Sequence, residues 1–252
     1  MKTDKYQNLD KSLLDGIYKD LLTKYKDTKQ LEQKLKSLIH QIWGSYYTSK
    51  PNFKKLIEKI KAADNPKEYV FSLLQIHSST KERLTFYTEF YNKVFEITGI
   101  SNTILDMGCG FNPLYFVLDE RFKNIRIDSV DIDKDEIEFL NEVFDFFKMK
   151  SMQAQLGNVL SFDYSKEYDL VLLLKILPVI EQQSRGQTLN LLKRIKAKNL
   201  VVSFPTKSIS GKLKGMESNY RELFIEISNK MGYQTQEIIL PNELVFVCKT
   251  VN

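Results

Sequence analysis

TILDMGCG, residues 103–110, is the stretch of sequence that decides the fold. Its first five residues form an apolar run typical of a buried β-strand. Gly108 and Gly110 follow directly, where they allow a tight turn and the close approach of a ligand to the backbone. Residues 111–113, Phe-Asn-Pro, do not supply the third glycine of a dinucleotide-binding motif. The turn therefore suits an adenosyl-amino acid without a phosphate, although an ordinary strand–helix turn would also fit.

Further short apolar runs follow this first one, and helical patterns separate most of them. We expect seven strands, at residues 103–107, 127–132, 152–156, 170–174, 200–204, 236–240 and 244–248. Helical stretches at residues 134–147 and 187–195 lie between them, and such alternation predicts a parallel, doubly wound sheet. Only Pro241, Asn242 and Glu243 join the last two strands, so those two should pair antiparallel.

The N-terminal part shows helical spacing of apolar side chains and no strand-like alternation. Leu13 and Ile17 lie on one face of an expected helix, and Pro66 starts another at a position where its missing N–H has no effect. We therefore predict an N-terminal helical domain at residues 1–98 and a sheet domain at residues 99–252.

The composition is that of a globular chain, because 42% of its 252 residues are hydrophobic and 27% are charged. No apolar stretch reaches the roughly 20 residues that span a bilayer, and the N-terminus lacks the apolar region of a signal peptide. Cys109 and Cys248 are too few for a disulfide framework or a zinc site. We therefore expect a cytoplasmic protein with no metal and no membrane partner.

Charge is distributed unevenly along the chain. Residues 1–100 hold 18 Lys and Arg against 12 Asp and Glu, and residues 101–192 hold 9 against 15. Residues 193–214 hold 7 basic residues and no acidic one. Two basic regions around an acidic middle fit a polyanionic partner such as nucleic acid. A lysine-rich chain with solvated helices is the alternative.

Residues 203–220, which follow the fifth expected strand, combine basic, hydroxyl and aromatic side chains around two glycines. Such a segment fits a loop that folds over a flipped base and its phosphates, and a solvated surface loop is the alternative. Together with lysines of the N-terminal domain it supplies the candidates for contact with RNA. These candidates are Lys54, Lys55, Lys59, Lys207, Lys212, Lys214 and Tyr220.

Polar side chains follow the second and third expected strands, at the edge of the sheet where a ligand of the glycine turn would lie. Asp131 ends the second apolar run, and an acid there can accept both ribose hydroxyls of an adenosine. Asp133 is better placed to cap the next helix. Asn158 follows the third run. Its amide can accept from the adenine amine and donate to a ring nitrogen, and a turn asparagine is an equal alternative.

Lys175 follows the fourth expected strand and is the residue most informative about the substrate. Enzymes that methylate an exocyclic base amine resemble one another in an Asp/Asn-Pro-Pro-aromatic sequence here, whose acceptors hold the hydrogens of the amine. A lysine offers donors only, so it suits a target with acceptors, such as O6 and N7 of guanine. A lysine whose stem extends along the strand end is the alternative. Neither Cys109 nor Cys248 is placed to attack a cytosine ring.

The segment at residues 77–83, HSSTKER, contains a possible helix start. Ser79 and Glu82 have the spacing of a capping box. Arg83 could in addition clamp the carboxylate of the cofactor with its two-pronged guanidinium. A helix start without that contact is the alternative.

Several stretches, in order over most of the chain, make the sequence familiar. They are HQIWGSYY at residues 40–47, IHSSTKER at 76–83, ILDMGCGFNPL at 104–114, LLLKILPVIEQQ at 172–183 and SFPTKSISGKLKGMESNY at 203–220. On these stretches the chain resembles the aminoglycoside-resistance 16S rRNA (guanine-1405-N7)-methyltransferases of the Arm/Rmt type.

The resemblance implies the seven-stranded sheet of class I S-adenosylmethionine-dependent methyltransferases, with S-adenosylmethionine as cofactor. It implies that the cofactor is bound by residues matching His77, Ser79, Arg83, Gly108, Asp131, Asn158, Val159, Leu174 and Gln183. The implied substrate is guanine 1405 of 16S rRNA in the assembled 30S subunit, not DNA, with the N-terminal domain docked on rRNA. The implied phenotype is resistance to 4,6-disubstituted deoxystreptamine aminoglycosides.

With this substrate, Lys175 is our candidate for the catalytic residue, because it could fix the base through O6 while N7 meets the methyl group. Two alternatives remain open. One is a small-molecule methyltransferase with the same sheet, and the other is a non-catalytic RNA-binding protein with a degenerate cofactor fold.

Overall fold

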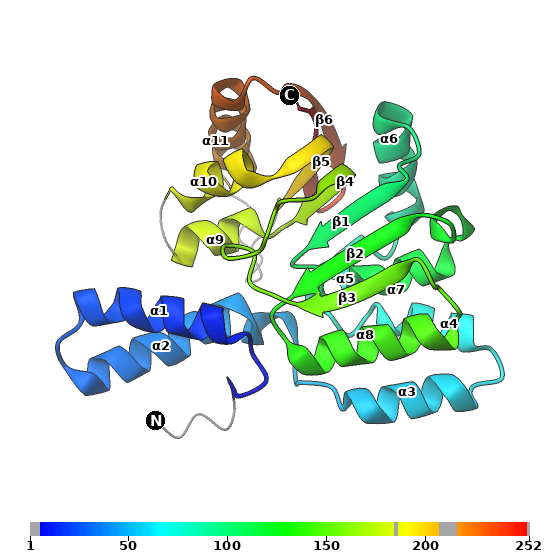
Figure 1. The fold of residues 1–252 in the computed structure, drawn as a ribbon, viewed down its shortest axis with the longest axis horizontal. Helices are drawn as coiled ribbons and strands as arrows, with labels where there is room; N and C mark the ends of the chain where they lie inside the picture. Colours follow the sequence, from blue (N-terminus) through cyan, green and yellow to red (C-terminus); the bar gives the residue numbers. More distant parts are fainter. Residues whose placement is uncertain (1–5, 184–185, 207–215, 251–252) are drawn as a thin grey trace.

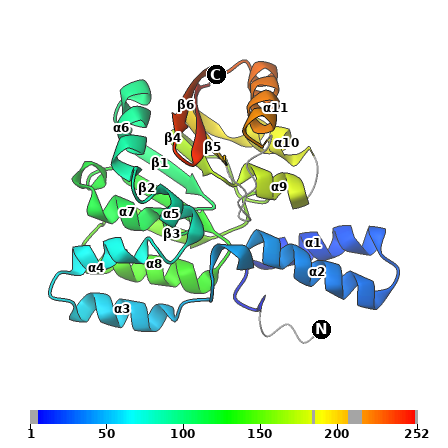
Figure 2. The ribbon, with the colours of Figure 1, turned by 180° about the vertical axis from the view of Figure 1, so that it is seen from behind.

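The computed structural model describes residues 6–183, 186–206 and 216–250 of the chain. Figures 1 and 2 show, from opposite sides, a twisted sheet with helices on both faces and a pair of helices, α1 and α2, that project beside it. Of the predicted RNA contacts, Lys207, Lys212 and Lys214 lie outside the described residues. Within those residues, no helix is both long and apolar enough to cross a membrane.

In the described part of the chain the sheet has seven strands, in the order β3-β2-β1-β4-β5-β7-β6. Their bounds are β1 Thr103–Met107, β2 Arg126–Asp131, β3 Met152–Leu156, β4 Glu167–Leu174, β5 Lys196–Pro205, β6 Gln234–Leu240 and β7 Glu243–Lys249. The strands β1 to β5 are parallel, and β7 pairs antiparallel with both β5 and β6. The predicted parallel sheet with its terminal antiparallel hairpin is confirmed.

Five strands begin earlier than the sequence indicated, and the difference is largest in β4 and β5. β4 begins at Glu167 and β5 at Lys196, whereas their apolar runs begin at residues 170 and 200. The extra residues of β4 and β5 alternate between exposed side chains, such as Glu167 and Lys196, and the buried side chains of Tyr168 and Ala197. A continuous apolar run therefore marks the part of a strand that is covered on both faces and misses a start that buries side chains on one face only.

The helices alternate with these strands and precede them. They are α1 Lys11–Lys24, α2 Thr28–Ile42, α3 Phe53–Ala62, α4 Pro66–Leu73, α5 Ser78–Arg83, α6 Tyr87–Thr98, α7 Asn112–Leu118, α8 Lys134–Phe146, α9 Leu177–Gln183, α10 Gln187–Arg194 and α11 Met216–Met231, with 3-10 turns at Gly44–Tyr46 and Glu120–Phe122. Asp133 caps α8 by accepting from the N–H of Asp135, as predicted. Pro66 lies in the first turn of α4, also as predicted.

The predicted capping box is wrong. α5 begins at Ser78 with His77 at its N-cap, so Ser79 lies inside the helix. The Glu82 carboxylate contacts Lys175 at the end of β4 instead of the start of its own helix. A long-range ion pair has overridden the local pattern.

Alternate side chains of the strands enter two hydrophobic clusters, one on each face of the sheet. In β4, Leu170 and Leu172 pack with side chains of α3, α4, α6, α7 and α8. Val171 and Leu173 pack with side chains of α9, α10 and α11 on the other face. Because successive strand residues point to opposite faces, helices on both faces require a continuously apolar strand.

The N-terminal helices do not form a single unit. α1 and α2 have a hydrophobic cluster of their own, in which Leu13, Leu35 and Ile39 pack with Val179 of α9. α3, α4 and α6 instead share the cluster of the sheet, and α3 lies beside α8 (Figure 1). The end of α6 coincides with the predicted boundary at residue 98. As a division between independent domains, that boundary stays a prediction.

The pair α1 and α2 is attached to the connection between β2 and α8. The N–H of Asp10 donates to the carbonyl oxygen of Ile132 at 2.8 Å, and Nε1 of Trp43 donates to the Asp133 carboxylate at 2.9 Å. The predicted ribose acceptor, Asp131, is the last residue of β2 and directly precedes this connection. The two N-terminal helices are therefore fixed next to the expected cofactor site.

One hydrogen bond at this attachment can be tested. Tyr47 donates its hydroxyl to Oε2 of Glu136 in α8, and both side chains are buried. Tyr47→Phe removes this hydroxyl donor, so the buried Oε2 of Glu136 loses its hydrogen bond. We expect the free energy of unfolding in urea to fall by about 1–3 kcal/mol. Tyr18→Phe, at an exposed site of α1, is the matched control. Equal losses in both variants would contradict this role of Tyr47.

Candidate functional site

A pocket opens at the carboxyl ends of β1, β2 and β4. The empty space along its lining, open solvent at the mouth included, is about 750 Å³. The predicted site residues that line it are His77, Ser79, Gly108, Asp131, Asn158, Val159, Leu174 and Lys175. Further walls come from Leu13, Ile42, Trp43, Tyr46, Tyr47 and Ile132, so the N-terminal helices enclose part of the pocket.

The glycine turn forms the floor of this pocket. Gly108 and Gly110 have φ of +64° and +48°, a left-handed conformation that side chains disfavour. A Cβ on Gly110 would lie 2.8 Å from Cε1 of His77, and one on Gly108 would lie 2.8 Å from Cδ1 of Ile176. The two glycines are therefore required both by the backbone and by the side chains packed against it.

Asp131, at the end of β2, faces the glycine turn. Its Oδ2 accepts from the N–H of Gly110 at 2.9 Å, and its Oδ1 accepts from the N–H of Ile132 at 2.6 Å. Burial raises the pKa of this carboxyl, and the two N–H donors oppose that rise. Each carboxylate oxygen has a second lone pair, so the side chain can also accept a ribose hydroxyl.

Asn158 makes a local contact in the turn after β3. Its Oδ1 accepts from the N–H of Leu160 at 3.0 Å, which is the turn interaction left open by the sequence. The same residue lines the pocket together with Val159. The contact uses the carbonyl oxygen of the amide, and the predicted contact with adenine stays a prediction.

His77 forms an aromatic wall of the pocket. Its ring stacks on Tyr46 at 5.1 Å between centroids and on Phe111 at 5.9 Å, and Nδ1 lies 2.8 Å from Oγ of Ser79. Burial lowers the pKa of His77 to about 3, with a further contribution from the positive charges of Lys175 and Arg83. The imidazole is therefore neutral at physiological pH and serves as a packed ring, not as a titrating acid or base.

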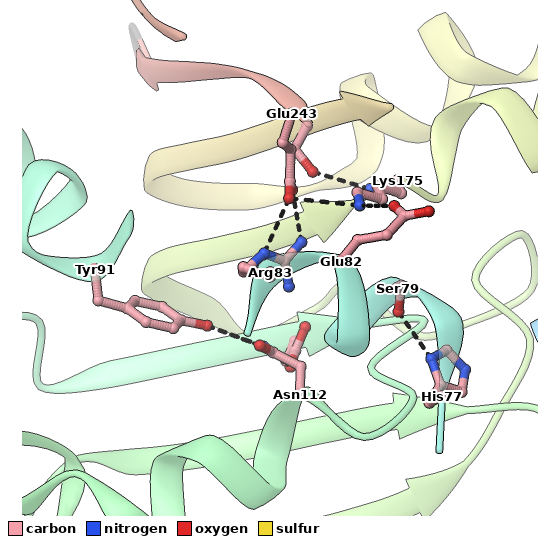
Figure 3. A network of polar contacts seen from close by, with 10 residues as sticks. His77, Ser79, Glu82, Arg83, Tyr91, Asn112, Lys175 and Glu243 are labelled. Carbon is pink, nitrogen blue, oxygen red and sulfur yellow. Dashed lines mark hydrogen bonds and ion pairs between the residues drawn. The ribbon is translucent and has the colours of Figure 1, made fainter. Parts of the chain in front are cut away.

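The sequence suggested that the guanidinium of Arg83 is free to bind a carboxylate of the cofactor. In the structure two of its nitrogens are already engaged by a carboxylate of the protein. Its Nε donates to Oε2 of Glu243 at 3.0 Å and its Nη2 donates to Oε1 at 2.6 Å (Figure 3). Both side chains are almost completely buried. Glu243 begins β7, 160 residues along the chain, so the local sequence around Arg83 contains no sign of this partner.

Of the two remaining predicted cofactor contacts, the structure describes the side chain of one and not of the other. Leu174, the last residue of β4, lines the pocket with an apolar side chain. Gln183 is the last residue of α9, and its side chain lies outside the described part of the chain.

Lys175 has an unusual backbone and an acidic environment. Its φ of +59° is left-handed, a conformation that non-glycine residues rarely adopt and that is often found at functional sites. Its Nζ lies 2.6 Å from Oε2 of Glu82 and 3.6 Å from Oε2 of Glu243 (Figure 3). The premise that this strand end offers donors only is therefore wrong, because Glu82 brings an acceptor beside the lysine.

Some residues at or beside the site were not assigned to it from the sequence. Glu136, in the first turn of α8, lines the pocket, and its buried Oε1 has no hydrogen-bond partner in the described structure. Burial raises the pKa of this carboxyl well above its usual value. Glu243 and Glu82 join the site through contacts of high sequence separation. The one feature of the sequence that could have indicated Glu136 is its position five residues after Asp131, near the end of a strand.

The predicted RNA contacts are spread over two regions. Lys54, Lys55 and Lys59 are exposed on α3, on the side of α8 away from the sheet. Tyr220, near the start of α11, stacks on Phe204 at 4.9 Å between centroids, so one face of its ring already has a partner. Contact of these residues with RNA stays a prediction. Within the described residues, no group of His, Cys, Asp and Glu is arranged to hold a metal ion.

Comparison with known proteins gives a consistent family. Residues 5–247 match a family model described as ribosomal RNA methyltransferase (FmrO). A 16S rRNA (guanine(1405)-N(7))-methyltransferase of Proteus mirabilis is 32% identical over 98% of this chain and 93% of its own length. One of Serratia marcescens is 30% identical over 95% of this chain and 94% of its own length.

Solved structures agree with the fold. The 16S rRNA methyltransferase RmtF, in complex with S-adenosyl-L-homocysteine, has a TM-score of 0.81 and 26% identity, covering 98% of this chain and 93% of its own. The 16S rRNA methylase ArmA has a TM-score of 0.66 and 37% identity, covering 81% of this chain and all of its own. The seven-stranded sheet of a methyltransferase is thus confirmed.

Asp106, before the glycine turn, gives the site a dependence on pH. Its Oδ2 accepts from Nδ2 of Asn112 at 2.8 Å. Burial raises its pKa to about 7, although Asn112 and Arg83 act in the opposite direction. The folded protein therefore holds this proton more tightly than the unfolded chain. Stability from this group is present below the unfolded value of 3.8 and is lost as the pH rises through about 7.

Asp106→Asn removes this titration. We compare the free energy of unfolding of the wild type with that of the variant. Their difference should fall by roughly a few kcal/mol between pH 5 and pH 7.5, because the pKa of the Asp106 carboxyl is raised in the folded protein. Urea unfolding of both proteins at the two pH values measures it. A difference between the two proteins that stays constant with pH would contradict the raised pKa of Asp106.

Proposed function

The chain belongs to the ribosomal RNA methyltransferase (FmrO) family, and on this premise we propose that it transfers a methyl group from S-adenosylmethionine to N7 of guanine 1405 of 16S rRNA. The observation that carries the proposal is the pocket in which the glycine turn and Asp131 lie beside Lys175. The similar protein RmtF was solved with S-adenosyl-L-homocysteine, the compound that remains after such a transfer.

The residues of the pocket fit an adenosyl-amino acid. Gly108 and Gly110 leave the backbone accessible at the end of β1, and Asp131 retains lone pairs for a ribose diol. Glu136 adds a buried oxygen, Oε1, that has no partner among the described residues. A ligand hydroxyl would satisfy this atom, since an unpaired buried acceptor is unfavourable. Asn158 would contact the adenine beside the apolar wall of Val159 and Leu174.

The reaction needs positioning more than acid–base chemistry. S-adenosylmethionine supplies a methyl group on a positively charged sulfur, and guanine N7 has an in-plane lone pair and no proton to lose. A general base is therefore unnecessary, in agreement with the neutral, packed ring of His77. Lys175 would donate to O6 and hold the base so that N7 points along the methyl–sulfur axis.

The proposed partner is 16S rRNA in the assembled 30S subunit, which places the activity in the cytoplasm. Lys54, Lys55 and Lys59 lie exposed on α3 and would contact phosphates. The product would carry a methyl group and a positive charge on the guanine. It would lose an acceptor for an aminoglycoside and would repel that cationic drug. Resistance to 4,6-disubstituted deoxystreptamines follows from this change.

The cofactor site is tested by Asp131→Ala. The variant loses the paired acceptor for the ribose diol, and we expect the affinity for S-adenosylmethionine to fall by at least about a hundredfold, the value of two hydrogen bonds to a charged group. Isothermal titration calorimetry measures this affinity. Asp163→Ala removes an exposed acid outside the pocket and is the matched control. Unchanged affinity in Asp131→Ala would overturn the role of Asp131.

The modified atom is tested by expression in a sensitive bacterium. N7-methylguanine is cleaved by mild reduction and aniline, so 16S rRNA from expressing cells should break at guanine 1405. The cells should resist gentamicin and stay sensitive to apramycin. A reverse-transcriptase stop at an adenine of the same helix, or resistance to apramycin as well, would indicate methylation of adenine N1 instead and contradict the proposal.

A further inference from the structure

A chain of alternating charges reaches the pocket at Lys175, the one of its four members that lines the pocket. It runs from Arg83 to Glu243, from Glu243 to Lys175, and from Lys175 to Glu82 (Figure 3). The side chains of the first three are at most 6% exposed, whereas that of Glu82 is 39% exposed. Glu82 is therefore the most exposed member of the chain, and it contacts Lys175, which is accessible from the pocket.

The Glu82 carboxylate retains capacity to accept hydrogen bonds. Its contact with Lys175 is made through Oε2 at 2.6 Å. An ionised carboxylate has about four acceptor positions on its two oxygens. Lys175 likewise has three N–H donors, and Glu82 takes one of them. The pair thus presents a donor and an acceptor side by side.

Guanine carries the complement of this arrangement on one edge. Its O6 is an acceptor, and the adjacent N1 carries a hydrogen and is a donor. Adenine has the reverse order, an amino donor next to the N1 acceptor. A base held by O6 on Lys175 and by N1–H on Glu82 keeps N7 uncovered. Since Lys175 lines the pocket that also contains Asp131, N7 of such a base would adjoin the cofactor.

The backbone at Lys175 supports a role of this kind. The left-handed φ of +59° is held by two contacts of the Lys175 N–H, one to the carbonyl oxygen and one to Oγ of Ser203, each at 3.1 Å. This conformation turns the chain directly after β4, and the side chain meets Glu82 on α5 instead of continuing along the strand. Strain that is held in place by buried contacts is typical of sites that position a ligand.

We propose that Glu82 is a specificity-determining residue, which accepts from N1–H of the target guanine while Lys175 donates to O6. The proposal rests on the proposed methylation of guanine N7 and adds how the base is recognised. It assigns to Glu82 a direct contact with the substrate, not only a contact with Lys175.

The test combines Glu82→Gln with a change of one atom on the base. Single-turnover methylation is measured on 30S subunits reconstituted with 16S rRNA that carries either guanine or N1-methylguanine at position 1405. We expect Glu82→Gln to slow methylation of the guanine substrate by about ten- to a hundredfold, the discrimination of a paired base contact. The wild type should lose a similar factor on N1-methylguanine. Glu82→Gln should methylate N1-methylguanine almost as fast as it methylates guanine. The reason is that the substitution and the N1-methyl group both remove the same contact, between Glu82 and N1–H.

Two controls isolate the cause. Calorimetry should give wild-type affinity of Glu82→Gln for S-adenosylmethionine, because Glu82 does not line the pocket. Glu89→Gln, an exposed acid on the neighbouring helix α6, should keep wild-type rates on both substrates.

The outcomes are distinct. The rate of Glu82→Gln on N1-methylguanine could instead be reduced by the product of the two separate factors. This result would mean that Glu82 acts only through Lys175, and it would overturn the proposal. An unchanged rate in Glu82→Gln would overturn it as well. Failure of the wild type to methylate the guanine substrate would instead refute the proposed function itself.

Discussion

The buried ion pair between Arg83 and Glu243 is the interaction on which the arrangement of the site depends. It joins a short helix of the N-terminal part, α5, to the first residue of β7. Burial alone would raise the pKa of Glu243, but the charges of Arg83 and Lys175 bring it below its usual value. Removing one partner would leave an uncompensated buried charge, which typically destabilises a protein by about 3–5 kcal/mol. With α5 fixed in this way, His77 packs against the glycine turn and Glu82 reaches Lys175.

A second set of contacts ties the N-terminal helices to the cofactor side of the sheet. Trp43 donates to Asp133, which caps α8, and Tyr47 donates to Glu136 in that helix. Leu13 of α1 and Ile42 of α2 also line the pocket. The part of the chain proposed to dock on rRNA thus contributes to the wall of the cofactor pocket.

The sequence was sufficient for features that depend on local pattern. Apolar runs located the strands, and positions directly after them located Gly108, Asp131 and Lys175 in one pocket. It was insufficient where a side chain finds its partner far along the chain. Arg83 and Glu82 were assigned from their neighbours in sequence to a cofactor clamp and a capping box. Glu82 contacts Lys175 and not the start of its own helix. Arg83 is paired with Glu243, a partner that its local sequence does not indicate, and its contact with the cofactor stays a prediction. Such pairs leave no periodicity and no local motif.

The charge chain that fixes α5 is proposed to receive the target guanine as well. Electron cryomicroscopy of the protein on the 30S subunit, trapped with an unreactive S-adenosylmethionine analogue, tests this claim most directly. We predict that guanine 1405 is turned out of its helix, with O6 and N1 facing Lys175 and Glu82 and with N7 toward the sulfur position. A guanine that stays stacked in the rRNA helix, or one whose N1 edge faces away from Glu82, would contradict the account.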